Sequence, residues 1–206
     1  MLATKIETPN KTHLGSRSLM PAKKLILFNG PPRSGKDTAA AHVWTKYIHA
    51  MHFKMSQPLK DSVKAFFNLS AADAQVAERN KDLPLDMFFG NTYRDVQISL
   101  SEHWGKEQFG IRVFGHLAVR NIRRSPSTLF VCSDTGFVDE IVPLIEFFGG
   151  ENILLVKLHR QGCNFSNDSR SYINIPNVRT LQLYNNDNIA NLYEQLDAVI
   201  DAWLTL

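Results

Sequence analysis

The sequence predicts an α/β fold in which a parallel sheet of about five strands has helices on both faces. Short apolar runs alternate along the chain with longer amphipathic segments, which is the pattern of successive strand–helix units. The apolar runs are continuous, as expected for strands that are buried on both faces. With 206 residues, of which 44% are hydrophobic and 21% charged, the chain can bury a large core. We therefore predict a single domain over residues 21–206.

The composition excludes several classes of protein. Two cysteines, Cys132 and Cys163, are too few for a disulfide scaffold or a four-cysteine zinc site. No apolar run reaches the roughly 18 residues that a membrane-spanning helix requires, so we expect no membrane partner. The net charge of +3 is too small to indicate nucleic-acid binding by itself.

The N-terminal half begins with a polar segment and then alternates strands with helices. Residues 1–20 lack apolar periodicity, so we expect a disordered or non-essential arm there. The run KKLILFN at 23–29 predicts a buried strand, and the glycine, proline and asparagine residues within 81–91 predict a loop. The other expected elements are a helix at 35–50, a strand at 52–55 and helices at 56–67, 70–80, 92–104 and 109–123.

The C-terminal half repeats the alternation and ends in a helix with one apolar stripe. Its expected elements are strands at 129–133, 152–159 and 180–183, a helix at 137–148 that stops at Gly149-Gly150, and an amphipathic helix from Ile189 to Trp203. In a parallel sheet the carboxyl ends of the strands share one edge, where ligands bind. Gly30–Thr38, Asp134 and Arg160 each follow a predicted strand, so we expect them at that edge.

The segment Gly30–Thr38 has the spacing G-x-x-x-x-G-K of a phosphate-binding P-loop. Gly30 turns the chain out of the strand, and the following backbone N–H groups form an anion nest at the positive end of a helix. Gly35 permits a close approach of the backbone, and Lys36 reaches the terminal phosphates. The residues that we expect to bind the phosphates of ATP are Gly30, Arg33, Ser34, Gly35, Lys36, Asp37 and Thr38.

The residue after the P-loop lysine is unusual. Asp37 stands where serine or threonine commonly binds Mg²⁺, and a carboxylate can also serve a hard cation. Thr38 is the adjacent hydroxyl, and Asp134 ends an apolar strand in the manner of a Walker B aspartate. We predict Asp37, Thr38 and Asp134 as the residues on the metal side of the site, although Asp134 is also suited to cap the following helix.

The stretch GPPRSGKDTAA at 30–40 resembles the P-loop of bacteriophage deoxynucleoside monophosphate kinases. Animal-type phosphomevalonate kinases are similar there and share the Gly-Lys-Asp variant. The resemblance covers most of residues 23–187 in the same order, but only the P-loop is specific. Its other parts are Pro58-Leu59-Lys60, Thr92-Tyr93-Arg94 with Gln97, Ser101-Glu102, Ser133-Asp134 with Phe137 and Glu140, and Arg160 with Asp168.

This resemblance implies a P-loop kinase that transfers the γ-phosphoryl group of ATP–Mg²⁺ to a small deoxynucleoside 5′-monophosphate. It also implies an acceptor-binding insertion of helices at about 56–123 and a short lid at about 160–172, in a cytoplasmic protein (the host cytoplasm if a phage encodes it). The expected catalytic residues are Lys36, Asp134, Arg160 and Arg170. The expected acceptor-binding residues are Lys60, Arg94 and Gln97.

Two departures from the family pattern keep other functions open. Gly136 stands where we expect the family to carry arginine after the strand-end aspartate, and Lys106 stands where the substrate helix usually has arginine. One alternative is a kinase acting on a hydroxymethylated base in DNA, a less favoured partner than a small nucleotide, with Arg120, Arg123 and Arg124 as the basic cluster. Another is a non-catalytic or regulatory ATP-binding protein. The sequence leaves a homodimer open.

Overall fold

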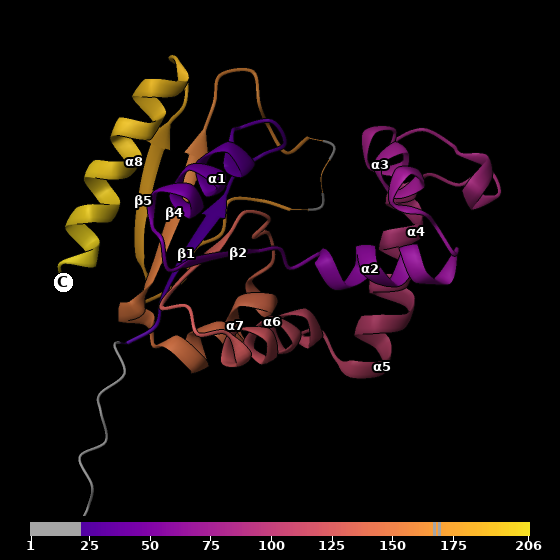
Figure 1. The fold of residues 1–206 in the computed structure, drawn as a ribbon, viewed down its shortest axis with the longest axis horizontal. Coiled ribbons are helices and arrows are strands. Elements are labelled where there is room, and N and C mark those ends of the chain that lie inside the picture. The colour runs from indigo at the N-terminus through magenta and orange to yellow at the C-terminus, as the bar shows by residue number, and fades with distance from the viewer. Residues whose placement is uncertain (1–21, 167, 169) are drawn as a thin grey trace, which may run out of the picture.

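The fold is built on one sheet of five parallel strands. The computed structural model describes residues 22–206 except 167 and 169, so the arm expected at 1–20 lies outside the described residues. The strands are β1 (Lys24–Asn29), β2 (Ala50–Phe53), β3 (Leu129–Cys132), β4 (Ile153–His159) and β5 (Arg179–Tyr184). Their order in the sheet is β2-β3-β1-β4-β5, and each neighbouring pair is parallel (Figure 1). The predicted five-stranded parallel sheet is confirmed.

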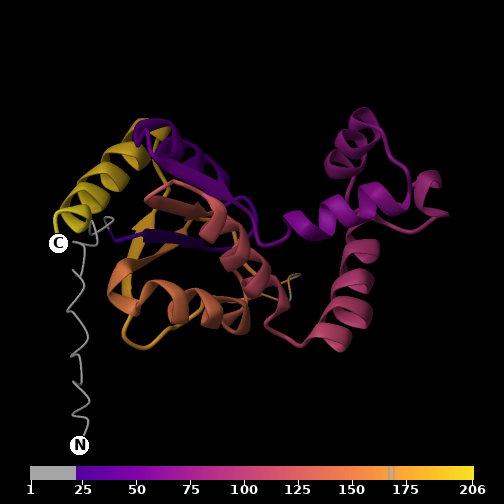
Figure 2. The same cartoon turned by 60° about the horizontal axis from the view of Figure 1, so that its bottom comes forward.

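Helices cover both faces of this sheet. The helices α1 (Lys36–Lys46) and α8 (Ile189–Leu204) pack on one face, and α6 (Val113–Arg124) and α7 (Val138–Phe148) pack on the other (Figures 1 and 2). Alternate residues of β1 face the two layers, and Leu25 to Phe28 are all fully buried. Each such side chain contributes roughly 1.5–3 kcal/mol of transfer free energy, which explains why the strands read as continuous apolar runs.

A helical arm, residues 57–109, projects from the sheet between β2 and α6 (Figures 1 and 2). It has a small core of its own, in which the rings of Phe88 and Tyr93 stack 5.5 Å apart. A capping box at Ser70 and Asp73 starts α3. The elements of the arm are α2 (Gln57–Phe66), α3 (Ala71–Arg79), η1 (Asp86–Phe88), α4 (Tyr93–Ser99), η2 (Leu100–Lys106) and α5 (Glu107–Phe109).

The helix break that the sequence predicts between 104 and 109 is wrong. The helix runs on from Tyr93 to Phe109 through a π-helical segment at Leu100–Lys106, and it ends at Gly110, whose φ is +86°. The extra residue per turn of a π segment interrupts the 3.6-residue periodicity. Gly105 does not stop the helix; it is buried, and a Cβ there would lie 3.4 Å from the Phe114 ring. The other predicted elements agree with the structure to within a few residues, as do the strands.

None of the helices in the part of the chain that the structure describes has both the length and the hydropathy of a membrane span.

Candidate phosphate-binding site

The P-loop lies at the carboxyl end of β1 and leads into α1, as its spacing predicts. A Cβ at Gly30 would lie 2.6 Å from the carbonyl oxygen of Leu158, so only glycine fits beside β4. Gly35 has φ +103°, and a Cβ there would lie 2.4 Å from Nδ2 of Asn185. That same Nδ2 donates to the Ser34 carbonyl at 2.9 Å. The loop is therefore braced from the end of β5 by an asparagine that sequence reasoning missed.

The remaining loop residues fall where an anion nest requires them. Arg33 has φ +64° and is exposed, whereas Ser34 is fully buried. Asp37 and Thr38 occupy the first turn of α1. Left-handed residues in such a turn, here Arg33 and Gly35, help to direct successive N–H groups toward one point, the kind of geometry that binds phosphate oxygens.

The Lys36 side chain is folded into the loop. Only 9% of the residue is exposed, and its Nζ donates to the Pro31 carbonyl at 2.6 Å. Burial first, and then the nearby positive charge of Arg170, lower the pKa of Lys36 to about 8. The P-loop lysine and the predicted catalytic Arg170 are therefore close enough to act on one anion.

This pKa predicts how anion affinity depends on pH. Below about pH 8 the Lys36 ammonium is charged in the ligand-free protein, and a bound polyphosphate would raise its pKa. Binding above pH 8 then requires proton uptake, so the dissociation constant for inorganic tripolyphosphate should rise between pH 8 and 9.5 by up to about tenfold per unit. Calorimetric titration measures it. Lys36→Met should bind weakly with no such slope; a wild-type affinity that is flat over this range contradicts the prediction.

Asp37 is held by a polar chain that runs back to β2. Its Oδ1 accepts a hydrogen bond from Ser133 Oγ at 2.8 Å and an ion pair from Lys54 Nζ at 2.8 Å. Because the Ser133 hydroxyl donates to Asp37, it accepts from His52 Nε2, 3.0 Å away. Burial opposes ionisation, but Lys54 and Ser133 together hold the pKa of Asp37 below its ordinary value. An ionised carboxylate whose bonded partners share Oδ1 suits a hard cation through Oδ2.

Asp134 joins the core to the arm. Its carboxylate accepts from the backbone N–H groups of Met55 at 2.8 Å and Ser56 at 3.0 Å, and from Ser56 Oγ at 2.7 Å. The predicted cap on α7 is wrong: α7 starts after Phe137 without a side-chain cap from the described residues, and Asp134 instead ties the end of β3 to the residues that lead into α2. The metal-binding and catalytic roles of Asp134 stay predictions. The helix-starting Ser56 was the sequence signal for this contact.

Two predicted arginines approach the loop from the segment after β4. Arg160 is exposed, and its Nη1 donates to the Arg33 carbonyl at 3.3 Å. Arg170 is mostly buried, and its Nε donates to Asp168 Oδ1 at 2.8 Å while Nη2 bonds the other carboxylate oxygen. Both guanidinium groups thus lie on the P-loop side of the sheet.

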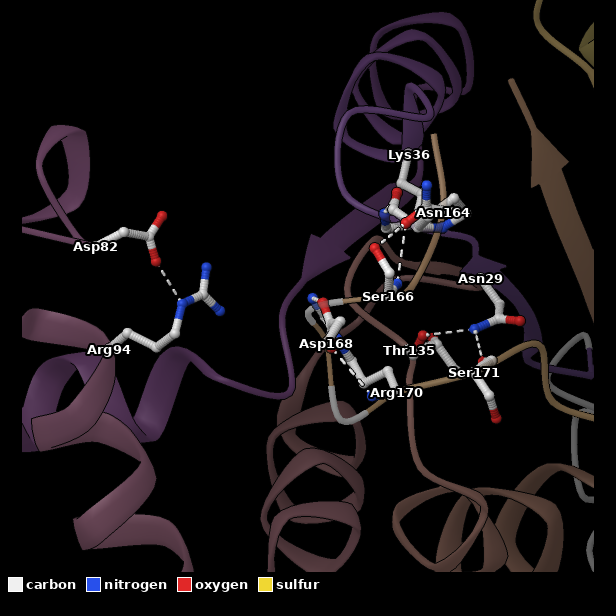
Figure 3. Close-up of polar contacts among 11 residues, drawn as sticks. Asn29, Lys36, Asp82, Arg94, Thr135, Asn164, Ser166, Asp168, Arg170 and Ser171 are labelled. Carbon is white, nitrogen blue, oxygen red and sulfur yellow. Dashed lines mark hydrogen bonds and ion pairs between the residues drawn. The ribbon is translucent and has the colours of Figure 1, made fainter. Parts of the chain in front are cut away.

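The predicted acceptor-binding residues belong to the arm, and two of them are ion-paired there. Arg94 Nε lies 2.5 Å from Asp82 Oδ1, and Lys60 Nζ lies 2.6 Å from Glu78 Oε2. Gln97 is half-buried one turn after Arg94. Figure 3 shows Arg94 extending from the arm toward the segment that carries Asp168, and the positive charge of Arg94 contributes to the lowered pKa of Asp168 after its closer bonds to Arg170.

An aromatic hollow of about 380 Å³ lies beside Arg160 at the ends of β4 and β5. The His159 ring is stacked 4.5 Å from Tyr172 and 5.0 Å from Tyr184, and its buried Nε2 has no hydrogen-bond partner among the described residues. Asn186 closes one side by accepting from the Gln161 N–H at 2.8 Å. Sequence reasoning missed this hollow, although aromatic residues at two strand ends were a signal for it.

Asn29, at the end of β1, ties three segments together and was also missed. It is fully buried, and its Nδ2 donates to the carbonyls of Thr135 and Ser171, each at 3.1 Å (Figure 3). Its Oδ1 accepts from the Ile173 N–H at 3.0 Å. A polar residue closing an apolar strand was the only sequence signal.

Comparison with known proteins gives one similar sequence. The chain is 26% identical over 190 residues to a protein of Acanthamoeba polyphaga mimivirus described as "Putative deoxynucleotide monophosphate kinase", covering 86% of this chain and 96% of that protein. No family model matches the chain.

The solved structures similar to this chain include two kinases. An APS kinase from Mycobacterium tuberculosis is 18% identical, with a TM-score of 0.45 over 90% of this chain and 99% of that one. A thymidylate kinase from Candida albicans is 13% identical, with a TM-score of 0.42 over 88% and 92% of the two chains.

Proposed function

We propose that this chain transfers the γ-phosphoryl group of MgATP to the 5′-monophosphate of a deoxynucleoside, giving the diphosphate. The observation that carries the proposal is the placement of Lys36, Arg160 and Arg170 around a P-loop toward which Arg94 extends from the arm. The similarity to a viral protein described as a deoxynucleotide monophosphate kinase supports a deoxynucleotide as the acceptor.

The phosphates, the base and the Mg²⁺ ion of ATP would each contact different residues of the site. The loop amides and the Lys36 ammonium would take the β- and γ-phosphates. The hollow formed by His159, Tyr172 and Tyr184 offers ring faces on which a base can stack. In the described residues no group of three or more His, Cys, Asp or Glu side chains is arranged to hold a metal alone. Mg²⁺ would be held between the phosphates of the nucleotide and a carboxylate oxygen of Asp37.

The reaction itself asks for positioning and charge neutralisation. An oxygen of the acceptor monophosphate attacks the γ-phosphorus, the bond from phosphorus to the bridging oxygen breaks, and ADP leaves. The acceptor is already an anion, so no strong general base is needed. Lys36, Arg160 and Arg170 would neutralise the charge on the transferring group.

The arm would bind the acceptor. Arg94 carries a planar fork that matches a phosphate in two hydrogen bonds, and it would exchange Asp82 for that phosphate. Lys60 and Gln97 complete the acceptor set in this proposal. Arm residues 57–109 would then form the acceptor-binding insertion, and residues 160–172 would act as the short lid.

The test is incubation with MgATP and each deoxynucleoside monophosphate in turn, with hydroxymethylated DNA in a parallel reaction and products separated by chromatography. Formation of ADP and one deoxynucleoside diphosphate is the expected result. No turnover with any monophosphate overturns the proposal. Phosphorylated DNA would then support the DNA-kinase alternative, and ATP binding alone would support a regulatory protein.

The structure gives the DNA alternative no support. Arg120, Arg123 and Arg124 lie in the last turns of α6, which ends just before β3 begins. The P-loop follows the end of β1, and β1 is parallel to β3. The basic cluster and the P-loop are therefore at opposite edges of the sheet.

Removing the ring at Tyr184 should weaken ATP binding selectively. A stacked ring pair is worth about 0.5–1.5 kcal/mol, so Tyr184→Ala should raise the KM for ATP about three- to tenfold and leave kcat nearly unchanged. Steady-state kinetics with ATP varied measures this. Tyr184→Phe keeps the ring and should behave as wild type; equal ATP constants in the alanine variant and the wild type contradict the prediction.

A further inference from the structure

Gly136, in the turn between β3 and α7, lies directly under the Arg170 side chain. A Cβ built on Gly136 would be 2.2 Å from Arg170 Cδ, 2.6 Å from Cγ and 3.3 Å from Cβ. Real Cβ contacts are not this short, so any side chain at position 136 would displace the arginine stem. The absence of a side chain at 136 is thus required by the observed position of Arg170.

A separate contact fixes the backbones on either side. Asn29 donates to the carbonyl of Thr135, which precedes Gly136, and to the carbonyl of Ser171, which follows Arg170 (Figure 3). One buried side chain from the strand that leads into the P-loop therefore sets the distance between the two segments. The backbones next to Gly136 and Arg170 are therefore joined through these two carbonyls, and in this arrangement the arginine stem lies over the glycine.

Asn29 is the last residue of the strand that leads into the P-loop, so its bond to the Ser171 carbonyl joins the segment that carries Arg170 to the start of that loop. The positive charge of Arg170 is close enough to lower the pKa of Lys36, and the carboxylates of Asp168, Asp134 and Glu140 are close enough to raise that of Arg170. The guanidinium head is paired with Asp168 alone among the described side chains. A phosphate between Lys36 and Arg170 would meet two cations from different segments.

We infer that Gly136 is a positioning residue, and that it acts with Arg170 as one phosphate-binding unit. The glycine leaves the space in which the arginine stem lies, and the arginine provides the positive charge. This inference rests on the proposed function for its catalytic consequence. It also explains why glycine stands after Thr135, where an arginine was expected: here the guanidinium comes from the segment after β4.

The test is a double-mutant cycle of Gly136→Ala and Arg170→Ala. Arg170→Ala should lower kcat/KM about 10²-fold, the usual cost of one transition-state donor, and Gly136→Ala alone should lower it at least about tenfold. In the Arg170→Ala background the two shortest contacts of the methyl group added at position 136 are gone and the one at 3.3 Å, with the Cβ at position 170, stays, so the second substitution should change little. The double variant is then expected to match Arg170→Ala within a factor of about two.

The same four proteins should be titrated with inorganic tripolyphosphate, and their thermal unfolding should be recorded. Tripolyphosphate affinity should fall in Gly136→Ala and Arg170→Ala and fall no further in the double variant. If the two losses add, or if Gly136→Ala binds and reacts as wild type, the inference is overturned while the proposed function stands. If neither the wild type nor any variant transfers phosphate, but the losses of tripolyphosphate affinity in Gly136→Ala and Arg170→Ala do not add, the proposed function fails and the inference about Gly136 and Arg170 stands. A Gly136→Ala loss equally large without Arg170 would be a purely structural effect and would overturn the inference.

Discussion

Replacing Lys36 by alanine is expected to lower kcat for phosphoryl transfer by about 10²- to 10³-fold, because one cation that faces the transferring group is removed. The side chain is buried inside the loop, and its ammonium bonds the Pro31 carbonyl at 2.6 Å, where solvent cannot take over its role. The measurement is the initial rate of ADP release with MgATP and the best deoxynucleoside monophosphate. Lys36→Arg should not restore the rate, since a broad planar fork cannot fit a space built around a narrow ammonium.

The melting temperature of Lys36→Ala shows whether its loss of kcat comes from the missing cation or from unfolding. Burial lowers the pKa of Lys36 to about 8, so the fold keeps the charged form at an energetic cost, and Lys36→Ala should melt no lower than the wild type. The matched control is Lys46→Ala on the same helix. Lys46 pairs with Asp201 at 3.0 Å on α8, away from the loop, so its loss should leave the rate unchanged. A Lys36→Ala enzyme with near wild-type turnover would remove the P-loop from the mechanism.

The elements of the fold could be predicted because their signals are local. A strand buried on both faces, such as Leu25–Phe28, is apolar whichever strands lie beside it. The order β2-β3-β1-β4-β5 could not be predicted from the sequence alone, because it depends on pairings between segments far apart in the chain. The π segment was missed for a related reason: it departs from the 3.6-residue periodicity that predicts helices, and its Gly105 lies beside Phe114, a residue of the next helix.

The candidate site divides along the same line. The position of the P-loop between a strand and a helix could be predicted because consecutive residues carry its pattern, and the position of Arg160 beside it could be predicted because Arg160 follows a strand. The bracing contacts were missed because each joins distant residues, such as Asn185 with Ser34 or Lys54 with Asp37. The sequence around Asn185 or Lys54 carries no pattern that predicts a distant partner, so only the structure could show these contacts.

Asn29→Ala is expected to cause the largest loss of stability, about 2–4 kcal/mol in the free energy of unfolding. The change removes the partner of the buried Thr135 carbonyl, the part-buried Ser171 carbonyl and the buried Ile173 N–H. Each unsatisfied buried group costs roughly 1–3 kcal/mol, and relaxation of the freed segments recovers part of the sum. Urea unfolding followed by circular dichroism measures the change, which should appear in the midpoint rather than in the slope.

Two variants sharpen this test. Asn29→Asp keeps the acceptor for Ile173 but loses both donors and places a carboxylate against two carbonyls, so it should destabilise at least as much as alanine. Asn152→Ala is the matched control: its Nδ2 donates one part-buried hydrogen bond, to the Phe148 carbonyl at 2.8 Å, so the loss should stay within about 1 kcal/mol. Equal stability of Asn29→Ala and Asn152→Ala would mean that Asn29 does not hold the turn after β3 to the segment after β4. The placement of Arg170 over Gly136 would then have to be explained by other contacts.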